Sequence, residues 1–304
     1  MTAVGQAQVQ KIGATTGRRR HDALARPRRA VARGALYALI CFGAFIELLP
    51  LLWMLSSALK PTEELFRIPP TWIPSRLVWS NFRDGLTYMP FDRFFVNTSL
   101  IAGITAVGAV LSASLVAFSF ARLRWPGRDA FFTLFLTAMM IPDAVRIVPE
   151  YALFRALRWV NTFTPLILPA WLAPAYFVFL LRQFMLTIPR EMDDAARIDG
   201  CSSFRIYWQI MLPMARPALG VVAIYQALGA WNDFFRPLIY IHSKAQFTLA
   251  LGLELFNNTG TGGAERAWNQ MMAVSLVITL PVLVLFFALQ RLFIQGIVVT
   301  GVKG

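Results

Sequence analysis

Charged residues are scarce in this sequence. Asp, Glu, Lys and Arg make up only 15% of its 304 residues, whereas a soluble domain usually carries about 25%. Hydrophobic residues make up 57%, and they come in long runs rather than short alternations. Such runs predict a polytopic membrane protein. The net charge of +13 does not indicate nucleic-acid binding, because most basic residues flank apolar runs, as membrane insertion requires.

Cysteine and histidine are rare as well. Cys41 lies inside an apolar run and Cys201 inside a charged segment, so a disulfide framework is not expected. His21 and His242 are too few for a metal site. No G-x-x-x-x-G-K-[ST] phosphate loop and no Ser/His/Asp or Cys/His set is present. We therefore expect no catalysis, metal or cofactor on this chain.

Six apolar runs are long enough to cross a bilayer as helices, which takes about 20 residues each. They predict an all-α membrane fold with six transmembrane helices. The expected spans are Ala35–Leu59, Val96–Phe120, Ala130–Tyr151, Thr164–Leu186, Pro217–Ile241 and Met271–Gln295.

The distribution of Lys and Arg predicts the orientation of these spans. Alternate connections, together with the two terminal segments, hold 18 of the 29 basic residues. The positive-inside rule then places both termini and residues 189–216 in the cytoplasm. A signal peptide is the alternative for the basic start, but the run from Ala35 to Leu59 is too long for one, and no cleavage site follows. Residues 1–34 are expected to form a disordered arm that touches anionic lipid, ahead of a permease domain at 35–304.

One charged segment, "DAARIDGCSSFRIYWQIMLP" at 194–213, interrupts the apolar pattern. Acidic residues after Pro189 fill the first turn of a short helix, where they complement its dipole. Gly200 then ends that helix, and Ser202 or Ser203 can cap a second one. The segment therefore predicts a helix-turn-helix between two membrane spans.

The second short helix is expected to have one apolar face. Phe204, Tyr207, Trp208 and Met211 follow the i, i+3, i+4, i+7 spacing of such a face. It has to be buried either on the membrane helices of this chain or on another protein. Physical reasoning alone leaves both alternatives open.

The fixed positions of this segment are Asp194-Ala195-Ala196, then Gly200, then Ile210 through Pro213. This spacing resembles the EAA loop of binding-protein-dependent ABC importer permeases, with Asp194 in place of the usual Glu. The stretches "FSFARLRWPGR", "MMIPDAVRIVPEY", "WNDFFRPLIY" and "ALQRLFIQGIVVTGVKG" are similar to the carbohydrate-uptake (maltose-type) branch of that family. The resemblance covers roughly residues 35–304.

The resemblance implies the type I ABC importer permease fold, with a core at about 92–295 and a coupling loop at 189–216 that lodges in an ATPase groove. It implies several partners in a bacterial cell membrane: a second homologous permease subunit, a dimeric ABC ATPase that binds ATP and magnesium, and an extracytoplasmic solute-binding protein. The expected coupling residues are Asp194, Ala195, Ala196, Gly200, Phe204, Tyr207, Trp208, Leu212 and Pro213.

Polar residues in the fifth expected span are candidates for a sugar pathway, because amide, carboxylate and aromatic groups suit hydroxyls and C–H faces. They are Tyr225, Gln226, Trp231, Asn232 and Asp233. The alternative is that Asp233 merely pairs with Arg236.

Small residues in the second expected span predict close helix packing. They are Gly103, Gly108, Ser112 and Ala113.

The function expected from these features is a permease subunit that moves a sugar or oligosaccharide inward by alternating access, powered by a partner ATPase. A stand-alone secondary transporter is the alternative, which requires coupling-ion carboxylates near the midplane. Glu47, in the first span, is the only candidate for such a group, and it leaves the helix-turn-helix unexplained. A membrane-embedded enzyme lacks a catalytic set.

Overall fold

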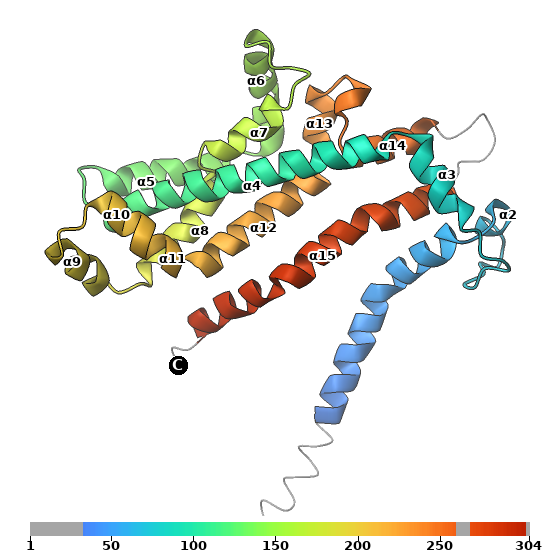
Figure 1. The fold of residues 1–304 in the computed structure, drawn as a ribbon, viewed down its shortest axis with the longest axis horizontal. Helices are drawn as coiled ribbons and strands as arrows, with labels where there is room; N and C mark the ends of the chain where they lie inside the picture. Colours follow the sequence, from blue (N-terminus) through green and yellow to red (C-terminus); the bar gives the residue numbers. More distant parts are fainter. Residues whose placement is uncertain (1–32, 260–267, 302–304) are drawn as a thin grey trace, which may run out of the picture. The chain divides into compact units, whose positions relative to one another are not determined.

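The computed structural model describes residues 33–259 and 268–301, and all the regular structure in these residues is helical (Figure 1). The chain divides into two compact units, Met1–Ser56 and Ser57–Gly304. Most of the helix Arg33–Ala58 therefore belongs to the first unit. The basic arm falls almost entirely outside the described residues, and its disorder stays a prediction.

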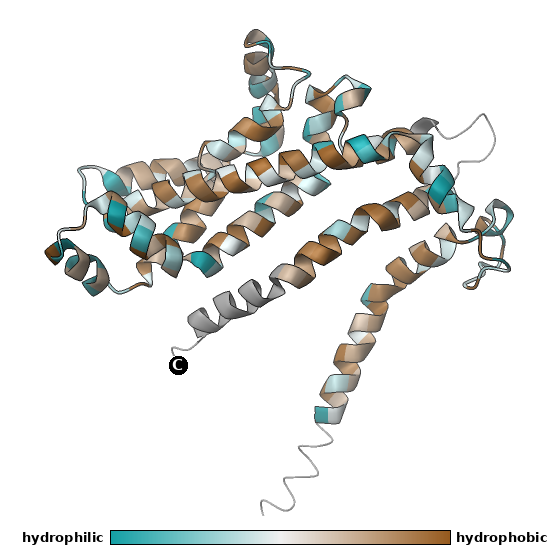
Figure 2. Cartoon of the chain, viewed as in Figure 1, coloured by the Kyte–Doolittle hydropathy of each residue, from teal (hydrophilic) through white to brown (hydrophobic). Residues whose placement is uncertain are grey.

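Four helices in the described part of the chain are individually long and apolar enough to cross a membrane. They are Arg33–Ala58, Phe91–Arg122 (α4), Thr164–Leu186 and Trp268–Ala288, the last within α15 (Trp268–Gly301). Figure 2 shows hydrophobic residues along most of the coloured part of α15. These helices agree with the first, second, fourth and sixth expected spans.

The third expected span is broken. α5 (Arg128–Thr137) continues through a 3-10 turn (η1, Ala138–Met140), and the path then bends by 97° into α6 (Asp143–Ala156). Pro142 lies at the bend, where it lacks an N–H to donate and keeps the preceding residue out of helical conformation. The prediction of one continuous helix over Ala130–Tyr151 was wrong.

The fifth expected span is also interrupted. α12 (Arg216–Asn232) stops before Asp233, which is extended, and α13 (Phe235–Tyr240) follows. The ring of Pro237 excludes a helical carbonyl four residues earlier, at Asp233, which explains where the break falls. The prediction of a continuous helix over Pro217–Ile241 was therefore wrong beyond Asn232.

The fourth expected span consists of α7 (Thr164–Trp171) and α8 (Ala175–Leu186) with a short irregular link. Ser112 of α4 satisfies backbone groups at this link. Its Oγ donates to the carbonyl of Ala170 and accepts from the N–H of Ala173, both over 3.2 Å. A hydroxyl on α4 thus replaces hydrogen bonds that the interrupted helix has lost.

The expected small-residue packing surface on α4 is present in part. A Cβ at Gly108 would collide with the indole of Trp171, so glycine is required for this close approach. Ala113 is fully buried. At Gly103 a Cβ would meet no atom within 4 Å, so the prediction of close packing was wrong for this residue.

An alanine column runs along the buried face of α4. Its members recur every fourth residue and are completely buried: Ala109, Ala113, Ala117 and Ala121. They belong to the main hydrophobic core together with Val178 and Leu181 of α8 and Val222 of α12. These three helices therefore form the packed centre of the larger unit.

Shorter helices complete the larger unit. They are α2 (Thr62–Leu65), α3 (Ser80–Tyr88), η3 (Lys244–Gln246) and α14 (Leu249–Thr259). Aromatic residues of α4 and α14 form a second small core that includes Phe91, Phe94 and Phe256.

Candidate functional site

The first short helix of the 189–216 loop is α9 (Glu191–Ile198), with acidic residues in its first turn as expected. Gly200 follows with φ +77°, so the prediction of a left-handed turn is confirmed. The Gly200 N–H donates to the carbonyl of Arg197 over 3.0 Å, and the Cys201 N–H donates to that of Ala196 over 2.9 Å. This pair of bonds is the Schellman motif, which satisfies the free carbonyls of a helix end.

The second short helix begins at Ser202, one of the two expected caps. Ser202 Oγ accepts from the N–H of Arg205 over 3.3 Å, and α10 (Ser203–Ile206) follows. The chain then widens into a π-helical turn (η2, Tyr207–Met211) before α11 (Leu212–Met214). Sequence reasoning missed this turn, which is a rare feature often found at functional positions.

Half of the expected apolar face is buried within this chain. Tyr207 and Met211 are almost completely inaccessible. The Tyr207 hydroxyl lies 2.8 Å from Ser114 Oγ of α4, and its ring centroid lies 5.4 Å from that of Phe118. These contacts anchor the loop to the membrane helices.

The other half of that face points away from the chain. Phe204 is 66% exposed and Trp208 56% exposed. Ile198, at the end of α9, is 87% exposed. The prediction of one shared face was therefore wrong, because Tyr207 and Met211 separate from Phe204 and Trp208. Large exposed apolar side chains beside a fixed base are typical of an interaction surface.

A buried ion pair fastens α9 to the membrane helices. An Arg122 Nη atom lies 3.3 Å from Asp193 Oδ2, and both side chains are almost fully buried. The other Arg122 Nη donates to the carbonyls of Met185 and Ile188 over 2.6 and 2.7 Å. Burial raises the pKa of Asp193, and the Arg122 guanidinium offsets part of that rise. Arg122 thus connects the end of α4, the end of α8 and α9.

Sequence reasoning used Arg122 only as a charge that orients the spans and Asp193 only as a helix-dipole residue. The two residues are far apart in the chain, so no local sequence pattern predicts their ion pair. The one available signal is an arginine on the buried face of α4, directly after Ala121. A cation in that position requires a partner.

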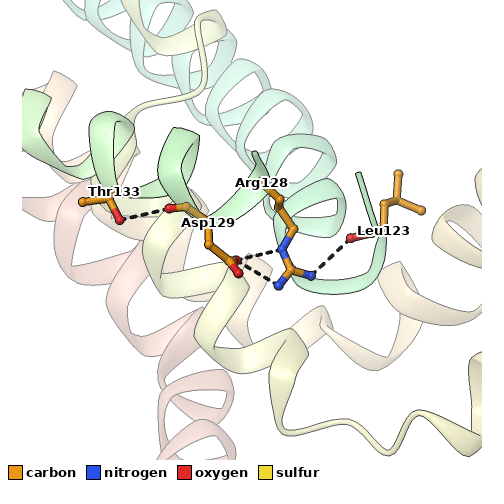
Figure 3. A network of polar contacts seen from close by, with 4 residues as sticks. All are labelled: Leu123, Arg128, Asp129 and Thr133. Carbon is orange, nitrogen blue, oxygen red and sulfur yellow. Dashed lines mark hydrogen bonds and ion pairs between the residues drawn. The ribbon is translucent and has the colours of Figure 1, made fainter. Parts of the chain in front are cut away.

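A second ion pair nearby is exposed and offers a contrast (Figure 3). Arg128 binds the Asp129 carboxylate over 2.9 Å and donates to the Leu123 carbonyl over 3.3 Å. The Asp129 side chain is 75% exposed. Exposed pairs contribute only about 0–1 kcal/mol, because water and salt screen them.

The remaining expected coupling residues occupy different environments. Asp194 and Ala195 are exposed on α9, whereas Ala196 is buried in the main core. Leu212 packs against that core, and Pro213 is exposed.

The structure does not gather the five expected pathway residues. Tyr225 is 54% exposed. Trp231 packs edge-on against Phe95, with ring centroids 5.7 Å apart. The Asn232 side-chain amide donates to the Leu228 carbonyl of its own helix.

Asp233 belongs to the break in the fifth span. Its carboxylate accepts from the backbone N–H of Arg236, in the first turn of α13, over 3.2 Å. The expected alternative was an ion pair between the Asp233 and Arg236 side chains. Asp233 does bind Arg236, but through the backbone N–H of Arg236. Among the five pathway candidates, Gln226 lines a large cavity to which the other four do not contribute.

That cavity has a volume of about 940 Å³. Residues of α5, α6, α7 and α8 line it, together with Gln226 and Arg236. Broken membrane helices around a cavity are typical of membrane transport proteins.

Comparison with known proteins agrees with this class. The profile of the family "binding-protein-dependent transport system inner membrane component" matches residues 109–299. The chain belongs to this family, the membrane-spanning permeases of ABC importers.

Several relatives cover nearly the whole chain. The chain is 39% identical to the arabinooligosaccharides transport system permease protein AraQ of Halalkalibacterium halodurans, over 86% of this chain and 94% of the relative. It is 31% identical to the sn-glycerol-3-phosphate transport system permease protein UgpE of Pectobacterium atrosepticum, again over 86% and 94%.

A solved structure shares the fold. It is a bacterial ABC transporter involved in the import of the acidic polysaccharide alginate, at 18% identity and a TM-score of 0.75. The match covers 84% of this chain and 94% of the alginate transporter chain.

Proposed function

We propose that this chain is one of two permease subunits of an ATP-driven importer for a sugar or oligosaccharide. The 189–216 loop lies in the cytoplasm and transmits movement between an ABC ATPase, which binds ATP and magnesium, and the membrane helices. An external solute-binding protein delivers the solute. The names of the relatives support a sugar or sugar-derived solute.

One observation carries the coupling role. The loop has a fixed inner side, made by Tyr207, Met211 and the Arg122–Asp193 pair, and an apolar outer side with Phe204 and Trp208. A rigid element with exposed aromatic residues transmits force only when its outer side is seated in a partner. A stand-alone secondary transporter gives no reason for such a surface.

We expect Trp208→Ala to weaken binding of the ATPase by at least about thirtyfold, because central interface aromatics contribute at least about 2 kcal/mol. The measurement is co-elution of the ATPase with the purified permease complex over a dilution series. Gln209→Ala is the matched control, since Gln209 is the exposed polar neighbour on the same turn. Equal retention of the ATPase by both variants would show that Trp208 does not contact it.

The proposed orientation predicts a labelling pattern. In a Cys41→Ser background, a cysteine at Ser80 should react with an impermeant thiol reagent added outside intact cells, and the native Cys201 should not. Gly262, expected on the outside, lies beyond the described residues and serves as a second test position. External labelling of Cys201 contradicts the proposed topology.

A further inference from the structure

Three interrupted membrane segments meet at the cavity of about 940 Å³. Its lining includes Ile141 and Pro142 at the bend of the third span and Leu172 through Pro174 at the link in the fourth. Arg236, just after the break in the fifth, lines it too. Irregular backbone at membrane depth is tolerated only where protein covers it or where it lines a water-filled cavity. The convergence of these breaks marks the cavity as a path for a polar solute.

One backbone position in the lining is held in an uncommon conformation. Ala173 has φ +51°, in the left-handed region that costs an ordinary residue energy. Its N–H is fixed by Ser112, as described above. Such positions persist where the surrounding structure enforces them, and they concentrate at functional sites.

The charges in the lining are balanced. Asp143 and Glu150 of α6 supply two carboxylates, and Arg146 and Arg236 supply two guanidinium groups. Arg146 forms an ion pair with Asp143. An anionic solute would meet two carboxylates as well as two cations, so the lining as a whole favours neither sign. Hydroxyl groups, in contrast, can both donate to carboxylates and accept from guanidinium groups.

The rest of the lining suits the apolar faces of a sugar ring. Trp159 and Tyr176 contribute aromatic side chains, and Leu153, Leu157 and Leu166 are among the aliphatic ones. Aromatic faces beside a few hydrogen-bonding groups match a ring that carries both C–H faces and hydroxyls. The volume falls within the range of about 300–1,000 Å³ that is usual for small-molecule sites.

We propose that this cavity is a solute-contact site for an uncharged, hydroxyl-rich ring, that is, a neutral sugar unit. Gln226 is the side chain of α12 that hydrogen-bonds the solute. The proposal rests on the importer function proposed above and names its substrate class.

The first arm of the test identifies the charge class. Uptake of radiolabelled arabinotriose, maltotriose, xylotriose, trigalacturonate and sn-glycerol 3-phosphate is compared between the native host and a strain lacking this gene. A neutral oligosaccharide whose uptake depends on the gene supports the proposal, whereas dependence of an anionic probe alone overturns it. Dependence of none of the probes contradicts the proposed sugar importer itself, which separates the two failures.

The second arm tests the cavity with neighbouring residues of one helix. Gln226→Met keeps the size of the side chain but removes its hydrogen-bonding amide, and Leu228→Met changes a residue of α12 that does not line the cavity. Gln226→Met should lower uptake of the dependent probe at least tenfold and Leu228→Met less than twofold, at equal amounts of each chain in the membrane. If Gln226→Met fails to accumulate, Tyr176→Leu takes its place. Equal uptake by cavity and control variants overturns the proposal.

Discussion

Arg122→Met is expected to abolish most transport while the chain still inserts into the membrane. The variant leaves the Asp193 carboxylate buried without its cation and the carbonyls of Met185 and Ile188 without their donor. Removing one partner of a buried ion pair costs about 3–5 kcal/mol. We therefore expect α9 to detach, and both uptake and solute-stimulated ATP hydrolysis to fall more than about tenfold. Uptake in cells and hydrolysis by the purified complex measure the two effects.

Two variants provide matched controls for this result. Arg128→Met breaks the exposed pair with Asp129 (Figure 3) and should change uptake little, since such a pair contributes about 0–1 kcal/mol. Combining Arg122→Met with Asp193→Leu replaces both charges with apolar groups, which is often close to neutral for stability. The double variant should recover part of the lost coupling. Equal defects in Arg122→Met and Arg128→Met would show that burial of the first pair has no special role.

The pH dependence of Arg122→Met follows from the same carboxyl group. Burial already raises the pKa of Asp193, and removal of Arg122 raises this pKa further because it removes the offsetting cation. Protonation then eliminates the unpaired charge, so the folded loop is stabilised as the pH falls and destabilised as it rises. The defect in hydrolysis should therefore be smaller in acidic than in alkaline buffer. A defect that grows on acidification contradicts this assignment.

Gly200→Val is expected to uncouple ATP hydrolysis from transport, because valine disfavours the backbone conformation that residue 200 adopts. Gly200 has φ +77°, and no atom lies within 4 Å of the place that a Cβ would take. A Cβ would therefore not collide with this chain, and the cost is that of left-handed geometry, about 1–2 kcal/mol for an ordinary residue. That energy corresponds to about a fivefold to thirtyfold fall in the equilibrium constant for forming the ordered turn. Stimulated ATP hydrolysis and uptake should fall together, by up to that factor.

Gly200→Asn separates this cause from the mere presence of a side chain. Asparagine adopts the left-handed conformation far more readily than valine. It should therefore retain most of the activity that valine loses, with both chains present in the membrane in equal amounts. Equal loss in both variants would indicate that the side chain itself, rather than the turn, disturbs the loop.

Rules about single residue types predicted the turn and the helix cap of the 189–216 loop. Gly200, and Ser202 as one of two possible caps, were found from the sequence because a left-handed turn and a helix cap depend on single residue types. The breaks at Pro142 and before Pro237 were missed because hydropathy, averaged over about 20 residues, gives a proline little weight. Both prolines were visible in the sequence. The rule that an interior proline interrupts a helix points to both breaks. It does not single them out, because α6 and α15 continue through Pro149 and Pro281.

Other parts of the site depend on contacts that no local pattern contains. Helical spacing placed Phe204 and Trp208 on the same face as Tyr207 and Met211, but only the last two are buried. The contacts of Tyr207 with Ser114 and Phe118 of α4 fix which side of the helix is covered. The Arg122–Asp193 pair and the group of residues around the cavity form only when distant segments pack together. Gln226 was selected for its polarity alone, together with four residues that do not line the cavity.

The alanine column of α4 restricts which substitutions this chain can tolerate. Alanine is a common residue that many proteins exchange freely, yet Ala109, Ala113, Ala117 and Ala121 have no accessible surface. Each added methylene in a fully packed position forces neighbouring side chains or backbone to move, at a cost of about 1–3 kcal/mol. Substitution by glycine instead loosens the helix by about 1 kcal/mol. These four small side chains are therefore among the least replaceable in the chain, because the space around each leaves no room for a larger one.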